Sequence, residues 1–320
     1  MMSFKRNLKL RTIKSASLLW YLQAFMRNGT LTPSIKKLRP TRKRVFVLGN
    51  GPSLKADVPP HATQLKNEDV MMVNQALTSS LAFDIKPSYY VLMDPAYWGF
   101  YTDEEDTEDK FITACIKDLD EALSRVDWDM TILVPHNFYT KRTAKGITLS
   151  NPHIRIATFN AVELYTFFRF QNWLYRHNLA IPSGINVLIA ALCCAITMNY
   201  KNIYLLGADS NWHTQLGVDE NNRTYSLETH YYHDDTQKCY TPYPLSFHME
   251  CITSAFKAYD MLGKNFEQIH NLSSISMIGA FPRDKLSLVL AGGGAVDKRG
   301  VFPIYFVLGS YPYQRGSYAA

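Results

Sequence analysis

Short apolar runs alternate with segments of helical periodicity through most of this chain. Seven runs of four or five residues have the length of buried strands: residues 45–48, 70–73, 89–93, 131–134, 154–158, 203–206 and 268–272. Between them, the spacing of apolar residues predicts helices over residues 109–125, 161–177, 185–199 and 247–264. This alternation is typical of a parallel sheet covered by helices, so it predicts an α/β fold.

The chain is long enough for one large domain with appendages. It has 320 residues, 47% of them hydrophobic, and domains usually run to about 100–200 residues. We predict a Rossmann-like, doubly wound, mostly parallel sheet over residues 44–283, after a basic extension (1–43) and before a C-terminal tail (284–320). Residues 210–246 are polar and aromatic without a clear period, which predicts an irregular lid over the site.

The positive charge is concentrated at the start of the chain. Residues 1–44 contain 12 lysines and arginines and no acidic residue, whereas the remainder contains 22 basic and 28 acidic residues. A mildly acidic body argues against an extended nucleic-acid surface, so we expect no nucleic-acid partner. Residues 15–26 follow basic residues and are largely apolar. They favour a helix lying on an anionic membrane or a partner, with an ordinary packed helix as the alternative.

Cysteine usage and hydropathy indicate the compartment. The five cysteines have no C-x-x-C spacing, which favours a reducing, cytoplasmic setting. The longest apolar run, residues 185–198, falls short of the roughly 18–20 residues that span a bilayer. We therefore expect a cytoplasmic protein, either free or peripheral on the inner face of the cell membrane.

The stretch GNGPS follows the first predicted strand directly. Gly49 and Gly51 would let the backbone approach a phosphate or nucleobase, with following amides as donors, and Asn50 can both donate and accept hydrogen bonds. The stretch is neither G-x-G-x-x-G nor a P-loop. On spacing alone, a nucleotide site and a plain strand-turn-helix connection remain open.

Further polar residues stand where other predicted strands end. Asn74, Asp94 and Asp209 each follow an apolar run, and the carboxyl ends of parallel strands meet at one edge, so we expect one cleft there. Ser183 and Gly184 precede the apolar helix, where backbone amides and the helix dipole attract an anion. An ordinary helix cap and turn is the alternative.

The motifs FVLGNGPSL, VNQ and PSGINVLIAALCCAITMNYKNIYLLGAD, followed by a histidine before a late helix, resemble the bacterial sialyltransferases of glycosyltransferase family 42. They also resemble related uncharacterised capsule and lipopolysaccharide proteins and the motility-associated nonulosonate transferases. The resemblance covers roughly residues 44–283. It implies inverting, metal-independent transfer of a sialic-acid-like sugar from a CMP-sugar to a glycan hydroxyl during surface-polysaccharide synthesis, with no cofactor.

The resemblance also implies roles for particular residues. His248 takes the place of the base that removes the acceptor proton, and His233 is the rival candidate. The residues expected to contact the donor nucleotide are Gly49, Asn50, Gly51, Ser53, Asn74, Ser183, Gly184, Asp209 and Asn211.

Two positions depart from the sialyltransferase pattern. Asp94 stands where those enzymes have asparagine, and Asn211, followed by Trp212, stands where they place a tyrosine on the leaving phosphate. A carboxylate would repel that phosphate, so we expect Asp94 to meet the sugar or the acceptor, together with Trp212 and Tyr225. The identity of the donor is correspondingly open.

Two groups have metal-ligand character. Asp127 and Asp129 have the D-x-D spacing that holds a divalent ion in many glycosyltransferases, but they precede a predicted strand and so belong to the opposite edge of the sheet. The His-x-x-His pair of residues 230–233 lacks a further ligand at diagnostic spacing. We expect no metal at either place.

Three alternatives remain open. The chain could use a different nucleotide sugar, or be an enzyme like the pterin-type pyrophosphokinases, which need a metal for the triphosphate. It could instead be a non-catalytic partner that binds sugar nucleotides. Formation of a homo-oligomer is also left open by the sequence.

Overall fold

The computed structural model describes residues 18–100, 107–164, 168–228, 237–241 and 243–292. Its main feature is a seven-stranded sheet of order β10-β6-β1-β2-β3-β4-β5, in which every pairing is parallel. The strands are β1 (Arg44–Leu48), β2 (Asp69–Val73), β3 (Tyr89–Val91), β4 (Met130–Pro135), β5 (Ile154–Phe159), β6 (Asn202–Leu206) and β10 (Ile269–Asn271).

Each predicted strand is confirmed, with ends within two residues of those expected. The central strands are buried along nearly their whole length, as in β1 and β6. Parallel strands covered on both faces read as continuous apolar runs, which is why the sequence located them. The α/β class and the mostly parallel, Rossmann-like sheet are likewise confirmed.

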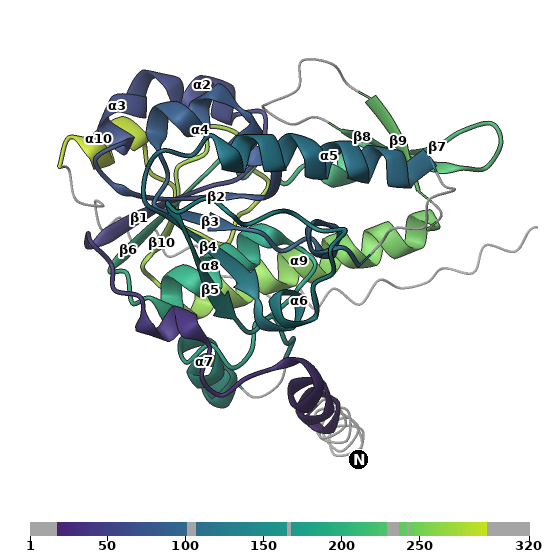
Figure 1. The fold of residues 1–320 in the computed structure, drawn as a ribbon, viewed down its shortest axis with the longest axis horizontal. Coiled ribbons are helices and arrows are strands. Elements are labelled where there is room, and N and C mark those ends of the chain that lie inside the picture. Colours follow the sequence, from purple (N-terminus) through teal and green to yellow (C-terminus); the bar gives the residue numbers. More distant parts are fainter. Residues whose placement is uncertain (1–17, 101–106, 165–167, 229–236, 242, 293–320) are drawn as a thin grey trace, which may run out of the picture.

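Helices cover both faces of the sheet (Figure 1). One core lies between the sheet and α7 (Phe168–Arg176), α8 (Val187–Thr197) and α9 (Leu245–Asn265). The other core lies on the opposite face, against α2 (Leu54–Asp57), α3 (Ala62–Leu65), α4 (Ser80–Ile85), α5 (Thr107–Ser124) and α10 (Leu286–Leu290). The arrangement is therefore doubly wound.

Two helices begin later than predicted. Residues 161–164 are not helical, because Glu163 forms a parallel bridge to Ile181. Helix α8 begins at Val187, because Asn186 has an extended backbone and its side chain accepts a hydrogen bond from Leu188 N at 2.8 Å. Asn186 is thus the helix cap, and Ser183 and Gly184 lie ahead of it.

The segment of residues 210–246 is more regular than predicted. After a short turn, η5 (Trp212–Thr214), it forms an antiparallel sheet of β7 (Leu216–Val218), β8 (Thr224–Glu228) and β9 (Gln237–Tyr240). Figure 1 shows this small sheet standing off one end of the large one, beside α5 and α9. The Tyr225 and Tyr240 rings pack edge to face across it, with 5.9 Å between their centroids.

The beginning of the described chain is helical. Residues 18–28 form a helix, followed by the turn η1 (Ser34–Lys37) that leads to β1. Among the residues that the structure describes, no helix combines the length and apolar character needed to cross a bilayer.

Candidate functional site

The order of the strands reverses between β1 and β6. From β1 the chain builds the sheet outward in one direction through β2, β3, β4 and β5, and then returns to add β6 and β10 on the other side of β1. In doubly wound folds, ligands bind outside the carboxyl ends of the two strands at such a switch point. The topology therefore places the candidate site where β1 and β6 end.

A cavity of about 300 Å³ lies at this point. It is bounded by the turns after β1 and β6, by the start of α8, by one face of α9 and by the small sheet. Six residues expected from the sequence line it: Asn50, Gly51, Asp209, Asn211, Trp212 and His248. Part of the predicted cleft is thus assembled in one place.

The turn after β1 packs directly against the turn after β6. Gly49 N donates to Leu206 O and Gly51 N to Gly207 O, both at 2.8 Å. A Cβ atom at Gly51 would lie 2.2 Å from an Asp209 carboxylate oxygen, so glycine is required there by close approach. The amides of Gly49 and Gly51 are thus bonded within the protein, and the expected contact of this turn with a donor nucleotide stays a prediction.

Ser53 and Asp209 join the two turns. Ser53 N and Oγ donate to the two carboxylate oxygens of Asp209 at 3.0 and 2.6 Å. Asp209 is buried, and desolvation raises the pKa of its carboxyl, while the hydrogen bonds from Ser53 oppose the shift. Because both oxygens are engaged, this pair positions the cavity wall, and the Ser53 amide is also unavailable to a phosphate.

Two buried polar atoms in the cavity wall have no hydrogen-bond partner among the described residues: Asn50 Oδ1 and His248 Nε2. They come from two different elements, the turn after β1 and helix α9. The hydroxyl of Ser210, which also lines the cavity, pairs with the buried hydroxyl of Tyr259. Ser210 also has a positive φ of 51°, an uncommon conformation for a residue with a side chain. Leaving a buried polar atom unpaired costs about 1–3 kcal/mol, so the convergence of the Asn50 and His248 atoms in one cavity is typical of a site that a ligand completes.

His248 lies in the first turn of α9. It shares a helix face with Cys251, Ile252 and Ala255, at spacings of three, four and seven residues, and all four line the cavity. Its ring packs edge to face against Phe247, with 5.8 Å between the centroids. An imidazole with a buried nitrogen in a cavity can accept a proton from a bound hydroxyl. The rival, His233, lies outside the described residues.

Asn74 and Asp94 lie at the ends of β2 and β3 but do not line the cavity. Asn74 turns into a short 3₁₀ helix with a φ of 46°, and its Oδ1 accepts from Met93 N at 3.4 Å. Asp94 caps the next turn by accepting from Ala96 N at 2.9 Å. Desolvation raises the pKa of Asp94, and that hydrogen bond opposes the shift. The ends of β2 and β3 lie on the side of β1 that faces away from β6, and so farther from the switch point than the ends of β1 and β6.

Ser183 and Gly184 also lie outside the cavity wall. Ser183 is buried, with its Oγ 3.3 Å from Ser254 Oγ, and Gly184 N donates to Glu163 Oε1 at 2.5 Å. The neighbouring residues Ile185 and Asn186 line the cavity instead, since α8 begins two residues later than expected.

Tyr225 belongs to the framework of the small sheet. Its ring packs over Gly217, where a Cβ would lie 2.5 Å from it, and Lys238 Nζ lies 4.6 Å from the ring centroid. The next residues of β8, Ser226 and Leu227, reach the cavity.

An apolar wall was missed in the sequence. Its members come from three parts of the chain: Ile185 and Leu188 around the start of α8, Leu216 and Leu227 in the small sheet, and Ile252 in α9. The face of α9 that includes His248 had a detectable signal, its helical spacing. The rest had none, because each apolar residue there also fits an ordinary core.

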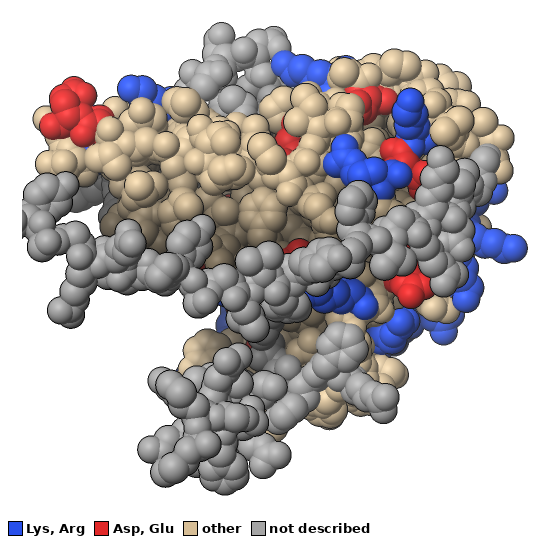
Figure 2. All heavy atoms as spheres, turned by 180° about the vertical axis from the view of Figure 1, so that it is seen from behind, with Lys and Arg blue, Asp and Glu red and all other residues tan. Residues whose placement is uncertain are grey.

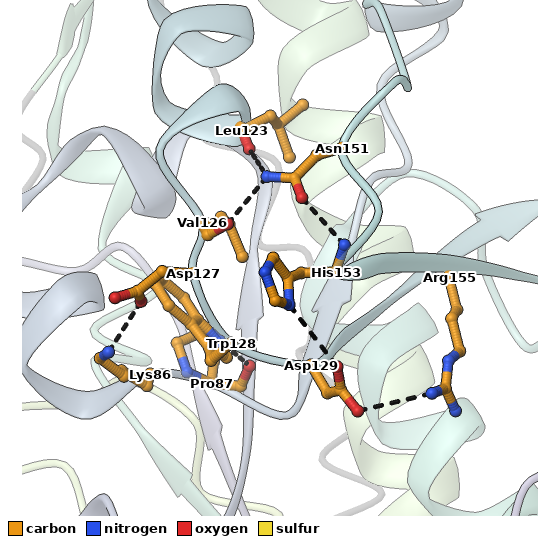
Figure 3. Close-up of polar contacts among 10 residues, drawn as sticks. All are labelled: Lys86, Pro87, Leu123, Val126, Asp127, Trp128, Asp129, Asn151, His153 and Arg155. Carbon is orange, nitrogen blue, oxygen red and sulfur yellow. Dashed lines mark hydrogen bonds and ion pairs between the residues drawn. The ribbon is translucent and has the colours of Figure 1, made fainter.

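The Asp-Trp-Asp stretch lies before β4, at the amino edge of the sheet and away from the cavity, as predicted. Asp127 pairs with Lys86 at 2.7 Å, and Asp129 with Arg155 at 3.4 Å (Figure 3). Between them, Trp128 Nε1 donates to Pro87 O at 2.9 Å. The carboxylates of Asp127 and Asp129 lie on opposite sides of Trp128 and point away from each other (Figure 3). The hydrogen bond from Lys86 is the main cause of the lowered pKa of Asp127.

Metal-ligating side chains do not cluster in the part of the chain that the structure describes: no group of three or more His, Cys, Asp or Glu residues is placed to hold an ion. The His-x-x-His pair of residues 230–233 falls outside that part. Metal independence therefore stays a prediction.

Comparison with known proteins identifies the family. The family model described as 6-hydroxymethylpterin diphosphokinase MptE-like matches residues 22–215. Among solved structures, the chain is similar to the MAf glycosyltransferase from Magnetospirillum magneticum AMB-1, at 12% identity and a TM-score of 0.41, over 78% of this chain and 37% of that one. No curated protein matches. The family match spans more than half of the chain, from the first described helix to the turn after β6, so the chain belongs to the family described as 6-hydroxymethylpterin diphosphokinase MptE-like.

Proposed function

We propose that this protein is a transferase that moves a nucleotide-activated group onto a hydroxyl. The switch-point cavity holds the nucleoside part of the donor, and His248 Nε2 accepts the proton of the acceptor hydroxyl. The observation that carries the proposal is the convergence of unpartnered atoms of Asn50 and His248 in one cavity at the switch point.

The lining of the cavity suits a nucleoside better than a polyphosphate. Its walls are largely apolar, with Trp212 available to pack against a flat ring. None of the described lining residues is a lysine or arginine, the side chains that usually neutralise a chain of phosphates. The unpartnered side-chain oxygen of Asn50 can instead pair with the edge of a base or with a ribose hydroxyl.

The first candidate reaction is glycosyl transfer from a CMP-sugar of the sialic-acid type, in the synthesis of a surface polysaccharide or lipopolysaccharide. The acceptor oxygen forms a bond to the anomeric carbon, and the bond from that carbon to the phosphate oxygen breaks. Nucleoside monophosphate leaves with the electron pair, and His248 takes the acceptor proton. The GNGPS turn and the buried helix support this candidate through their resemblance to family 42.

The second candidate follows from the family match. An enzyme of the pterin diphosphokinase type transfers diphosphate from a nucleoside triphosphate to a hydroxymethyl group, with a divalent ion on the phosphates. Here the hydroxymethyl oxygen attacks the β-phosphorus, nucleoside monophosphate leaves, and His248 again takes a hydroxyl proton. The apolar wall with Trp212 would hold the flat pterin.

A thermal-shift screen separates the candidates. CMP, UDP, GDP, ADP, ATP and 6-hydroxymethylpterin are each tested with and without Mg²⁺; a ligand at 100 times its Kd adds about 2.7 kcal/mol to stability. Stabilisation by CMP without Mg²⁺ supports the first candidate. Stabilisation by the pterin, and by a triphosphate only with Mg²⁺, supports the second. If none of these ligands stabilises the protein, the proposed function is wrong.

A further inference from the structure

The helix of residues 18–28 is attached to the body by one apolar face. Leu18, Tyr21 and Phe25 share this face and pack against the core that contains α7 and α8. Tyr21 is only 5% exposed, and its hydroxyl donates to Leu179 O at 3.0 Å. At the end of the helix, Lys141 Nζ donates to Asn28 Oδ1 at 3.0 Å. The position of the helix is therefore fixed.

The outer face of the same helix is apolar too. Leu19, Leu22 and Met26 follow one another at spacings of three and four, so they share a face, and they are 66%, 46% and 77% exposed. Trp20, beside them, is 69% exposed. A helix that faces water carries polar side chains on its outer surface. Four large apolar side chains together mark a contact surface instead.

This helix lies in the most basic part of the chain. Residues 1–44 and 130–208 together contain 19 lysines and arginines and a single acidic residue, Glu163, whereas the rest contains 15 basic and 27 acidic residues. The two segments contact each other, for example through Thr30 N, which donates to Asn160 Oδ1 at 2.8 Å. Seen from behind, most of the visible lysine and arginine side chains lie in the right half of the molecule, above the lower edge where this helix lies (Figure 1 and Figure 2).

We propose that the outer face of the helix of residues 18–28 docks on an anionic membrane surface. The helix would lie in the plane of the interface, with Leu19, Leu22 and Met26 among the acyl chains. The ring of Trp20 suits the level of the headgroups. Arg27 in the last turn of the helix, and Lys141, which contacts Arg27 and Asn28, attract anionic lipids.

Charge complementarity favours an anionic membrane over a second copy of the chain and over residues 293–320 as the partner of this face. A second copy of the chain would bring the same basic segments against each other, and like charges repel. Residues 293–320 are apolar in part, but they contain Lys298, Arg299 and Arg315 against one acidic residue, Asp297. That segment is positively charged as well, whereas an anionic bilayer offers both an apolar interior and negative headgroups.

Co-sedimentation with vesicles tests the proposal on the full-length protein. The vesicles contain phosphatidylcholine and phosphatidylglycerol in equal parts, or phosphatidylcholine alone. The test variant carries Leu19→Gln, Leu22→Gln and Met26→Gln. The control carries Ile275→Gln and Leu288→Gln, which replace similarly exposed apolar side chains (62% and 57%) near β10 and α10, at the other end of the sheet. Circular dichroism and thermal unfolding are used to check that both variants remain folded.

The wild-type protein and the control are expected to bind the anionic vesicles, and added salt should weaken that binding. Partitioning of the triple variant falls more than about tenfold, because three side chains lose their burial in acyl chains. The proposal is overturned if the wild-type protein ignores anionic vesicles or if the triple variant binds like the control. It is also overturned if the triple variant converts a wild-type dimer into a monomer without affecting lipid binding, because the face then belongs to a protein interface.

Discussion

At the scale of single residues, the candidate site depends on a very close approach between Gly51 and Asp209. Gly51→Ala adds a Cβ 2.2 Å from the carboxylate oxygen. We expect a loss of about 1–3 kcal/mol in the free energy of unfolding, as for other overpacked positions, measured by urea denaturation. Gly279→Ala is the matched control, since a Cβ there meets no atom within 4 Å. Equal stability of the two variants would contradict this account of the turn.

Residues were predictable where their signal was local. Asn50 follows a strand directly, so it could be proposed from the sequence, whereas His248 was proposed from the resemblance to family 42; both line the cavity. Asn74 and Asp94 carried the same local signal as Asn50, yet Asn74 Oδ1 accepts from Met93 N and Asp94 caps the turn after β3. Ser210 was missed, because neither its positive φ nor its contact with Tyr259 is visible in the sequence.

At the scale of elements, the Ser53–Asp209 pair holds the turn after β1 against the turn after β6. Desolvation raises the pKa of Asp209 above its ordinary value, so the folded protein binds this proton more tightly than the unfolded chain. The stability that Asp209 contributes is therefore full in acid and is lost as the pH rises through the raised pKa. We expect the wild-type advantage over Asp209→Asn to shrink as the pH rises from below the ordinary pKa of an aspartate through the raised pKa of Asp209.

Urea unfolding at a series of pH values measures this advantage. Asp127→Asn serves as a control whose stability difference from the wild type should change with pH in the opposite direction, since the hydrogen bond from Lys86 lowers the pKa of Asp127. The contribution of Asp127 is present above its ordinary pKa and is lost as the pH falls. A wild-type advantage over Asp209→Asn that stays flat or grows with pH would show that Asp209 is not desolvated in the fold.

Elements with a strong apolar pattern were predictable, and weakly patterned ones were not. All seven strands of the large sheet were located, because most of them are buried on both faces; the edge strand β5 is only partly buried. The small sheet was missed: β7, β8 and β9 are short and are joined partly by the contact of Tyr225 with Tyr240. A contact between distant residues leaves no periodic trace. The late starts of α7 and α8 arise in the same way, from a bridge and a side-chain cap.

At the scale of the whole molecule, the site is assembled from two parts of the chain. The family match covers residues 22–215, which include the turns after β1 and β6 and the start of α8. His248 comes from α9, beyond the matched segment, and the small sheet lies between them in the sequence. The part of the cavity wall formed by these turns and by the start of α8 thus lies in the segment that the family model matches, and the candidate base lies in the segment that follows it.

The central claim is that His248 accepts the proton of an acceptor hydroxyl at this cavity. It is tested most directly by transfer kinetics of His248→Gln with the donor found in the thermal-shift screen. His153→Gln, at the amino edge of the sheet, is the control. We expect kcat/KM of His248→Gln to fall about 100- to 10,000-fold, the usual contribution of a general base, while the donor still stabilises the variant and the control keeps full activity. Full transfer by His248→Gln would contradict the account.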